Sequence, residues 1–177
     1  MNPFIALLRG INVSGQKLNK IAAHRTNLEY AGFAGDKTYI QSGNLILKSV
    51  KSDPKVIEEQ VKALILKDFG FDVPTFVTTA KYLEETVANN PYPDVEVKKL
   101  FVAYLKDEPS TERVEALNAQ DFSPEDYVID CKRIYLHAAL GAAKSKLSNN
   151  YFESKLKVKA TMRNWNTTNK LIALARE

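Results

Sequence analysis

The sequence has few of the residues on which many enzyme mechanisms depend. Its 177 residues include one cysteine and two histidines. With a single cysteine, Cys131, the chain can form neither an intramolecular disulfide nor a cysteine zinc cluster, and we expect a buried, inert thiol. His24 and His137 alone suggest no serine or cysteine triad and a poor metal site. The composition therefore indicates no metal and no cofactor, and it supports no particular reaction.

Long hydrophobic runs are also missing. No apolar stretch approaches the roughly 20 residues that a transmembrane helix needs. No charged and then apolar leader precedes the first strand, so we expect a cytoplasmic protein without membrane contact. The hydrophobic content of 45% is enough for a core, and the length suits one compact domain or two small ones. We favour two, residues 1–79 and 80–177.

The net charge of +4 is modest, but it is unevenly distributed. Lysine and arginine number 10 against 7 acidic residues in 1–79, 7 against 12 in 80–137, and 8 against 2 in 138–177. The acidic middle and the basic C-terminal region could neutralise each other in the fold. The basic region could instead create a local positive field for an anion.

The first half has the pattern of an α+β sheet domain. Strands are expected at residues 4–8, 35–41, 44–49 and 71–79, and helices at 19–31 and from Pro54 to just before Gly70. This β-α-β-β-α-β order is the ferredoxin-like arrangement. Pro74 cannot donate a hydrogen bond within a sheet, so the last strand should lie at an edge, as this topology requires.

That topology makes the first and third strands antiparallel neighbours. The end of the first strand, with Arg9 and Asn12, should then lie beside Ser42, Gly43 and Asn44 at the start of the third. Arginine offers a planar fork to a carboxylate or phosphate, and asparagine can both donate and accept. The sequence therefore predicts a polar, anion-binding site at this end of the sheet. Asn12 and Asn44 could instead only close turns.

The second half is predicted as a smaller α+β unit that ends in helices. We expect a short helix around Leu83 and Val87, strands at 99–105, 127–130 and 133–137, and helices at 110–119, 144–157 and from Thr161 onward. The acidic pairs Glu58–Glu59 and Glu84–Glu85 are expected on solvated helix faces. There is no tandem repeat, although both halves share a strand-helix-strand-strand rhythm.

The last helix has a clear division of faces. At about 100° per residue, its apolar side should face the core, with the members Trp165, Thr168, Leu171, Ile172 and Ala175. Thr161 can cap the start, and with Arg163 in the first turn this start could bind an anion. A polar face opposite a core face is also often only solvated.

Several segments of the chain are similar to one family. The motifs are Leu7–Val13 with Gly15, Gln41–Asn44, Ser145–Leu147, and Ala160–Thr161 with Arg163–Thr167. Together they resemble the bacterial family known as domain of unknown function 1697. The resemblance implies an α+β fold with a ferredoxin-like first half, found in bacterial cytoplasmic proteins, and no established activity. It also implies that ten residues fill family motif positions and are candidates for ligand binding: Arg9, Asn12, Gly15, Ser42, Asn44, Lys146, Thr161, Arg163, Asn164 and Thr167.

Three functions remain possible from the sequence. The preferred one is a pocket for a small anionic or phosphorylated ligand, formed by the first-strand loop, the Ser42–Asn44 turn and the start of the last helix. The second is nucleic-acid binding through the basic C-terminal region, although residues 44–48 lack the stacking aromatics of RNA-binding sheets. The third is a protein interaction module whose motifs are purely structural. The sequence does not indicate an oligomeric state.

Overall fold

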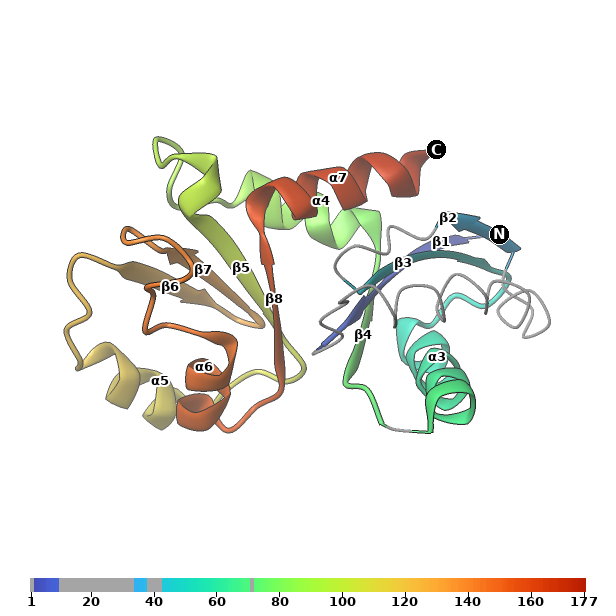
Figure 1. The fold of residues 1–177 in the computed structure, drawn as a ribbon, viewed down its shortest axis with the longest axis horizontal. Coiled ribbons are helices and arrows are strands. Elements are labelled where there is room, and N and C mark those ends of the chain that lie inside the picture. The colour runs from blue at the N-terminus through green and yellow to red at the C-terminus, as the bar shows by residue number, and fades with distance from the viewer. Residues whose placement is uncertain (1, 10–33, 38–42, 71) are drawn as a thin grey trace. The chain divides into compact units, whose positions relative to one another are not determined.

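The computed structural model describes residues 2–9, 34–37, 43–70 and 72–177, and Figure 1 shows its helices and strands. Contacts divide the chain into two compact units. Unit 1 comprises residues 1–85 and 170–177, and unit 2 comprises residues 86–169. Each unit contains one four-stranded sheet in which all pairs are antiparallel. Since helices accompany both sheets, the predicted α+β class is confirmed.

The sheet of unit 1 has β1 (Asn2–Leu8) near its centre. The strand order is β2-β3-β1-β4, with β2 at Ala34–Lys37, β3 at Asn44–Ser49 and β4 at Thr75–Thr78. All residues from Phe4 to Leu8 are buried, which is typical of a strand covered on both faces. The strand β4 follows Pro74 and lies at an edge, so this prediction is confirmed.

The helix α3 (Pro54–Phe69) covers one face of this sheet. Asp53 caps its start by accepting a hydrogen bond from the Lys55 N–H, and Gly70 ends it with a φ of 75°. Both boundaries agree with the sequence prediction. Apolar residues of α3 and of the sheet form one buried cluster: Phe4, Ala6, Leu8, Leu45, Leu47, Ile57, Val61, Ile65 and Val73.

Two predicted features of unit 1 lie outside the described residues. One is the helix expected at residues 19–31, with His24, and the other is the end of the strand expected at 35–41. The ferredoxin-like arrangement therefore stays a prediction for this half.

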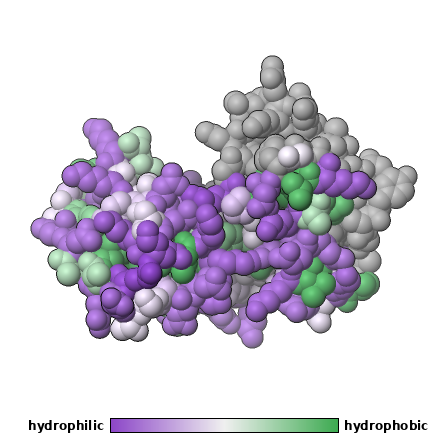
Figure 2. Space-filling model, turned by 90° about the horizontal axis from the view of Figure 1, so that it is seen from below, coloured by the Kyte–Doolittle hydropathy of each residue, from purple (hydrophilic) through white to green (hydrophobic). Residues whose placement is uncertain are grey.

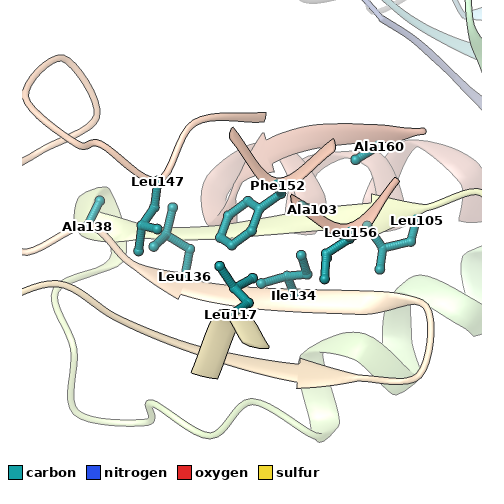
Figure 3. Packing of buried hydrophobic residues seen from close by; sticks show 10 residues of the cluster. All are labelled: Ala103, Leu105, Leu117, Ile134, Leu136, Ala138, Leu147, Phe152, Leu156 and Ala160. Carbon is teal, nitrogen blue, oxygen red and sulfur yellow. The ribbon is translucent and has the colours of Figure 1, made fainter. Parts of the chain in front are cut away.

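Unit 2 repeats the same strand order with its own elements. Its sheet runs β6-β7-β5-β8, with β5 at Leu100–Leu105, β6 at Asp126–Asp130, β7 at Arg133–His137 and β8 at Ala160–Asn164. The helices α5 (Thr111–Asn118) and α6 (Asn149–Leu156) lie on one face. Their residues Leu117, Phe152 and Leu156 pack against side chains of the sheet, as Figure 3 shows.

The end of the chain differs from the prediction. A helix was expected from Thr161, but residues 160–164 form β8 and pair with β5. The helix α7 (Trp165–Arg176) starts after this strand. The reason is tertiary, because the backbone groups of these residues hydrogen-bond to an open strand edge that the local sequence does not reveal. Four of the five residues predicted on the apolar side of α7 are buried, namely Trp165, Thr168, Leu171 and Ala175, whereas Ile172 is partly exposed.

Other sequence predictions also need correction. The helix expected at 144–157 is shorter, because Ser148 caps α6 and accepts from the Tyr151 N–H. Cys131 is exposed rather than buried, since it lies in the tight turn between β6 and β7 with a φ of 50°. Glu58 is buried rather than solvated, because its carboxylate accepts a hydrogen bond from the Val77 N–H of β4.

Two short helical segments lie between β4 and β5. The helix α4 spans Ala80–Ala88, and a 3₁₀ turn at Val97–Lys99 precedes β5. On the face seen in Figure 2, hydrophilic residues predominate and apolar ones are scattered among them. Among the described residues, every helix is too short or too polar to cross a bilayer.

Candidate functional site

The two predicted site residues of unit 1 that the structure describes, Arg9 and Asn44, lie where β1 ends. The Leu8 N–H donates to the Gly43 carbonyl at 2.7 Å, and the Arg9 N–H donates to the Pro74 carbonyl at 2.9 Å. The backbone that leads to the Arg9 side chain is thus held from both neighbouring strands. The Arg9 side chain itself is partly exposed. It is a cationic group on a rigid support at the sheet end, as a binding residue requires.

Gly43 and Asn44 belong to the same end of the sheet. Gly43 has a φ of 67°, a conformation that favours glycine. Asn44 is the first residue of β3, pairs with Leu7 of β1 and is fully buried. Leu7 and Asn44 are partners in the ladder, so their side chains project from the same face. Arg9 follows the last residue of β1 directly, so its backbone lies at the same end of the sheet as Asn44.

Three members of the predicted set cannot be placed. Asn12, Gly15 and Ser42 lie outside the described residues. Their part in a site stays a prediction from the sequence.

In unit 2 the structure brings Thr161 and Arg163 together. Both lie on β8, two residues apart and on one face. Arg163 is only 8% exposed, and its Nη1 atom donates to Thr161 Oγ1 at 2.9 Å and to the Met162 carbonyl at 2.8 Å. Burial lowers the pKa of Arg163 to about 10, and neighbouring Tyr104 opposes this shift. The guanidinium is still protonated at neutral pH, so unit 2 buries a positive charge.

Hydroxyl groups surround this face of the sheet. Tyr104 of β5 pairs with Thr161 across the ladder, and its hydroxyl lies 3.1 Å from Thr168 Oγ1 of α7. On β7, the Tyr135 hydroxyl donates to the Thr86 carbonyl of α4 at 3.0 Å. All five of these residues are buried. Buried hydroxyls need such partners, and these bonds satisfy them.

Asn164 and Thr167 form the cap of α7. The Asn164 Oδ1 atom accepts a hydrogen bond from the Thr167 N–H at 2.8 Å. This is the usual bond between an N-cap side chain and the third helical residue. Asn164 thus has the role that the sequence analysis gave to Thr161.

Lys146 lies apart from Arg163 within unit 2. Its side chain is exposed, and its N–H donates to Glu125 Oε2 at 3.2 Å. The next residue, Leu147, packs with Phe152 and Ile134 on the face of the sheet covered by α5 and α6. Arg163 projects from the opposite face because it follows Met162, which packs against that cluster. The structure does not bring these two predicted residues together.

Sequence reasoning missed Tyr104, Thr168 and Tyr135, which no motif marks. The sequence did contain one signal of the strand β8. Residues 160–163 alternate between small or apolar and polar side chains, a period of two that is typical of a strand. Among the described residues no group of three histidine, cysteine or acidic side chains could hold a metal ion.

Comparison with known proteins identifies the family. The sequence profile described as "Protein of unknown function (DUF1697)" matches residues 1–135. The chain belongs to this family. Its description assigns no activity to the members, so it adds no catalytic role to any residue discussed above.

Comparison with solved structures supports the fold. The conserved bacterial protein SP0830 from Streptococcus pneumoniae matches with a TM-score of 0.72 and 20% sequence identity, and the match covers 100% of this chain and 99% of that protein. At this identity the likeness concerns the fold alone. No curated protein matches the chain.

Proposed function

We propose that the protein binds a small anionic or phosphorylated ligand at the end of β1, with Arg9 as the cationic contact. The observation that carries this proposal is the anchorage of the backbone at two successive residues, where the Leu8 N–H donates to the Gly43 carbonyl and the Arg9 N–H donates to the Pro74 carbonyl. A fixed backbone reduces the conformational entropy that the side chain loses when it binds. The planar guanidinium can then bind a carboxylate or phosphate with two hydrogen bonds.

Neighbouring groups complement Arg9 in this proposal. Asn44 begins β3 at the same end of the sheet and carries an amide that can donate and accept. Asn12, Gly15 and Ser42 belong to the same two sequence motifs and complete the proposed site as predictions. The single cysteine of the chain forms no intramolecular disulfide, which supports our further proposal of a cytoplasmic location.

The motif residues of unit 2 have contacts that support a structural role. Arg163 binds Thr161 and a carbonyl of its own strand, and Asn164 caps α7 through Thr167. Lys146 was expected to bind the same ligand, but its side chain is exposed on the surface of unit 2. We therefore propose Arg9 as the ligand contact. Substitution of Arg163 tests the alternative, in which the motif residues of unit 2 only stabilise the fold.

The test compares Arg9→Gln with the unaltered protein in a thermal-shift panel of inorganic phosphate, nucleotides, sugar phosphates and carboxylates. A ligand present at 100 times its Kd stabilises a protein by about 2.7 kcal/mol. We expect at least one compound to raise the Tm of the unaltered protein and to have little effect on Arg9→Gln. Arg113→Gln removes an exposed arginine of α5 and is the matched control. Equal shifts in all three proteins would refute the proposal.

Two further measurements separate the alternatives. Arg163→Gln should lower the free energy of unfolding by about 1.5 to 3 kcal/mol, since it removes charged hydrogen bonds from a buried site. If that variant is instead stable and fails to bind the compound, Arg163 is a ligand contact. Single-stranded RNA binding that weakens steeply with added salt would favour a nucleic-acid function over a small ligand.

A further inference from the structure

A hollow of about 520 Å³ lies in unit 2, and the N–H of Lys146, a member of the predicted set, donates to Glu125, one of its lining residues. It is lined by residues 118 and 120–129. These residues form the end of α5, the loop after it and most of β6, which is an edge strand. Its volume is in the range of small-molecule sites.

The lining is acidic. It contains the carboxylates of Asp121, Glu125 and Asp126, and it contains neither lysine nor arginine nor histidine. Ser123 donates to Asp121 Oδ1 through its hydroxyl at 2.7 Å and its N–H at 2.9 Å. These bonds, the hydroxyl bond above all, lower the pKa of Asp121. Tyr92 and the Tyr127 N–H donate to the two oxygens of Asp126. The carboxylates are thus oriented by neighbouring donors.

Glu125 provides the observation that points to a ligand. The residue is 7% exposed, and its Oε2 atom accepts a hydrogen bond from the Lys146 N–H. Its other oxygen, Oε1, is buried and has no hydrogen-bond partner within the described part of the chain. A buried acceptor without a donor carries the full cost of its desolvation. A rotation of the Glu125 side chain that turns this oxygen into the hollow would let a donor cation there remove this cost.

Aromatic rings favour an organic cation at this place. Phe122 and Tyr127 line the hollow, and their ring centroids lie 5.9 Å apart in an edge-to-face arrangement. Aromatic faces attract cations and also pack against a hydrocarbon chain. A metal ion is disfavoured because no set of three suitable ligands comes together in the described residues.

We propose that this hollow binds an alkylammonium group, with Glu125 and Asp121 as its carboxylate partners and Phe122 and Tyr127 as its aromatic wall. The group could belong to a small free amine or to a lysine side chain of another protein. Both sources share the same chemistry of one primary ammonium on an alkyl chain. The site is independent of the ligand proposed at Arg9.

The test uses butylamine and Nα-acetyl-lysine methylamide as probes, both protonated at pH 7. We expect saturable changes in the backbone amide NMR signals of residues 118–129. Isothermal titration should show that Glu125→Gln and Asp121→Asn each weaken binding at least about tenfold, because each removes a charged hydrogen bond. The glutamine can still accept from the Lys146 N–H, and Asp121 is exposed, so at least one variant should fold normally.

A control variant and a neutral probe test whether binding requires the acidic lining and the charge of the amine. Glu112→Gln alters an exposed residue of α5 outside the lining and should bind the probes unchanged. The neutral probe 1-butanol should not bind. Tighter binding of one amine than the other identifies the source of the ammonium group. Absence of saturable changes at residues 118–129, or equal affinity in the unaltered protein and both carboxylate variants, would overturn the proposal.

Discussion

The two sheets of the molecule have the same strand order although their sequences differ. In each, the first strand of the unit pairs antiparallel with the third and the last. In each, the second strand lies outside the third at an edge. The first strands, β1 and β5, are the most apolar of their sheets and are almost entirely buried. The two units therefore share a buried strand inside the sheet and one strand order, although the neighbouring strands differ in sequence.

The two units also attach the last helix before the final strand in the same way. In unit 1, Glu58 of α3 accepts from the Val77 N–H of β4 at 3.1 Å. In unit 2, Glu153 of α6 accepts from the Ala160 N–H of β8 at 2.7 Å. Each carboxylate thus satisfies a backbone donor on an edge strand.

The second faces of the sheets differ. In unit 1 this face carries Ile5, Leu7 and Ile46, with Asn44 at its end. In unit 2 it carries Tyr104, Tyr135, Thr161 and Arg163 beside the apolar Val102. Arg163 binds Thr161, and the two tyrosine hydroxyls bond to the Thr168 hydroxyl and the Thr86 carbonyl. The same strand pairing therefore tolerates polar side chains on this face, provided that the polar groups are satisfied.

The largest effect is expected from the core of unit 2. Phe152 is fully buried between α6 and the sheet. Phe152→Ala should lower the free energy of unfolding by about 3 to 5 kcal/mol, because it leaves a cavity. Urea denaturation measures this value. Ser154→Ala, an exposed change on the same helix, should stay within about 0.5 kcal/mol. A loss that is just as small for Phe152→Ala would show that α6 contributes little to this unit.

Glu58 and Glu153 each accept a hydrogen bond from an edge strand, and their substitution tests whether the two bonds contribute equally to stability. Glu58 is buried and Glu153 is partly exposed. Glu58→Ala should therefore cost about 1.5 to 3 kcal/mol, and Glu153→Ala less, because water can replace the second carboxylate. The glutamine variants retain an acceptor and should cost less than the alanine variants. Equal losses in urea denaturation would mean that burial does not distinguish the two units here.

Helix caps offer a smaller comparison. Asp53 caps α3 and Asn164 caps α7. Replacement of either by alanine should cost about 1 kcal/mol, since one N–H at the helix start loses its acceptor. Asn164→Asp retains the acceptor and should be nearly neutral, as measured by thermal denaturation. A loss for Asn164→Asp as large as for Asn164→Ala would show that the amide nitrogen, not the cap oxygen, is the group that stabilises α7.

The smallest effect on stability is expected in alkaline solution, and it comes from a tyrosine of unit 2. Burial, with smaller contributions from Tyr151 and Asp126, raises the pKa of Tyr127 from 10.0 to about 12. The unfolded chain then loses this proton first, so stability is constant below pH 10 and decreases as the pH rises from about 10 to about 12. Tyr127→Phe should show a smaller decrease in urea denaturation between pH 9 and pH 11. An identical decrease in both proteins would contradict this assignment.

Much of the fold could be read from local sequence signals. The start and end of α3 follow from Asp53, Pro54 and Gly70, whose conformational preferences act within a few residues. The position of β4 at an edge follows from Pro74, which lacks an N–H. The approach of the β1 end to Gly43 and Asn44 follows from the strand order. The first two predictions rest on short-range properties of the chain, and the third rests on the order of the strands and helices along it.

The candidate site was predicted less completely. The motif around Arg163 was recognised, but its residues were assigned to a helix start because Thr161 is a good cap. Pairing with β5 decided otherwise, and the cap role passed to Asn164. Tyr104 and Thr168 lie 64 residues apart in the sequence, so no local pattern could connect them.

By itself, the sequence determined the α+β class, the family, the helix boundaries set by caps and glycines, and the apolar side of α7. Only the tertiary structure decided that residues 160–164 form a strand, that Glu58 is buried and Cys131 exposed, and that a hollow lined by acidic residues follows α5. The physical reason is that capping and periodicity act between near neighbours, whereas burial and edge pairing depend on residues that folding brings together from distant parts of the chain.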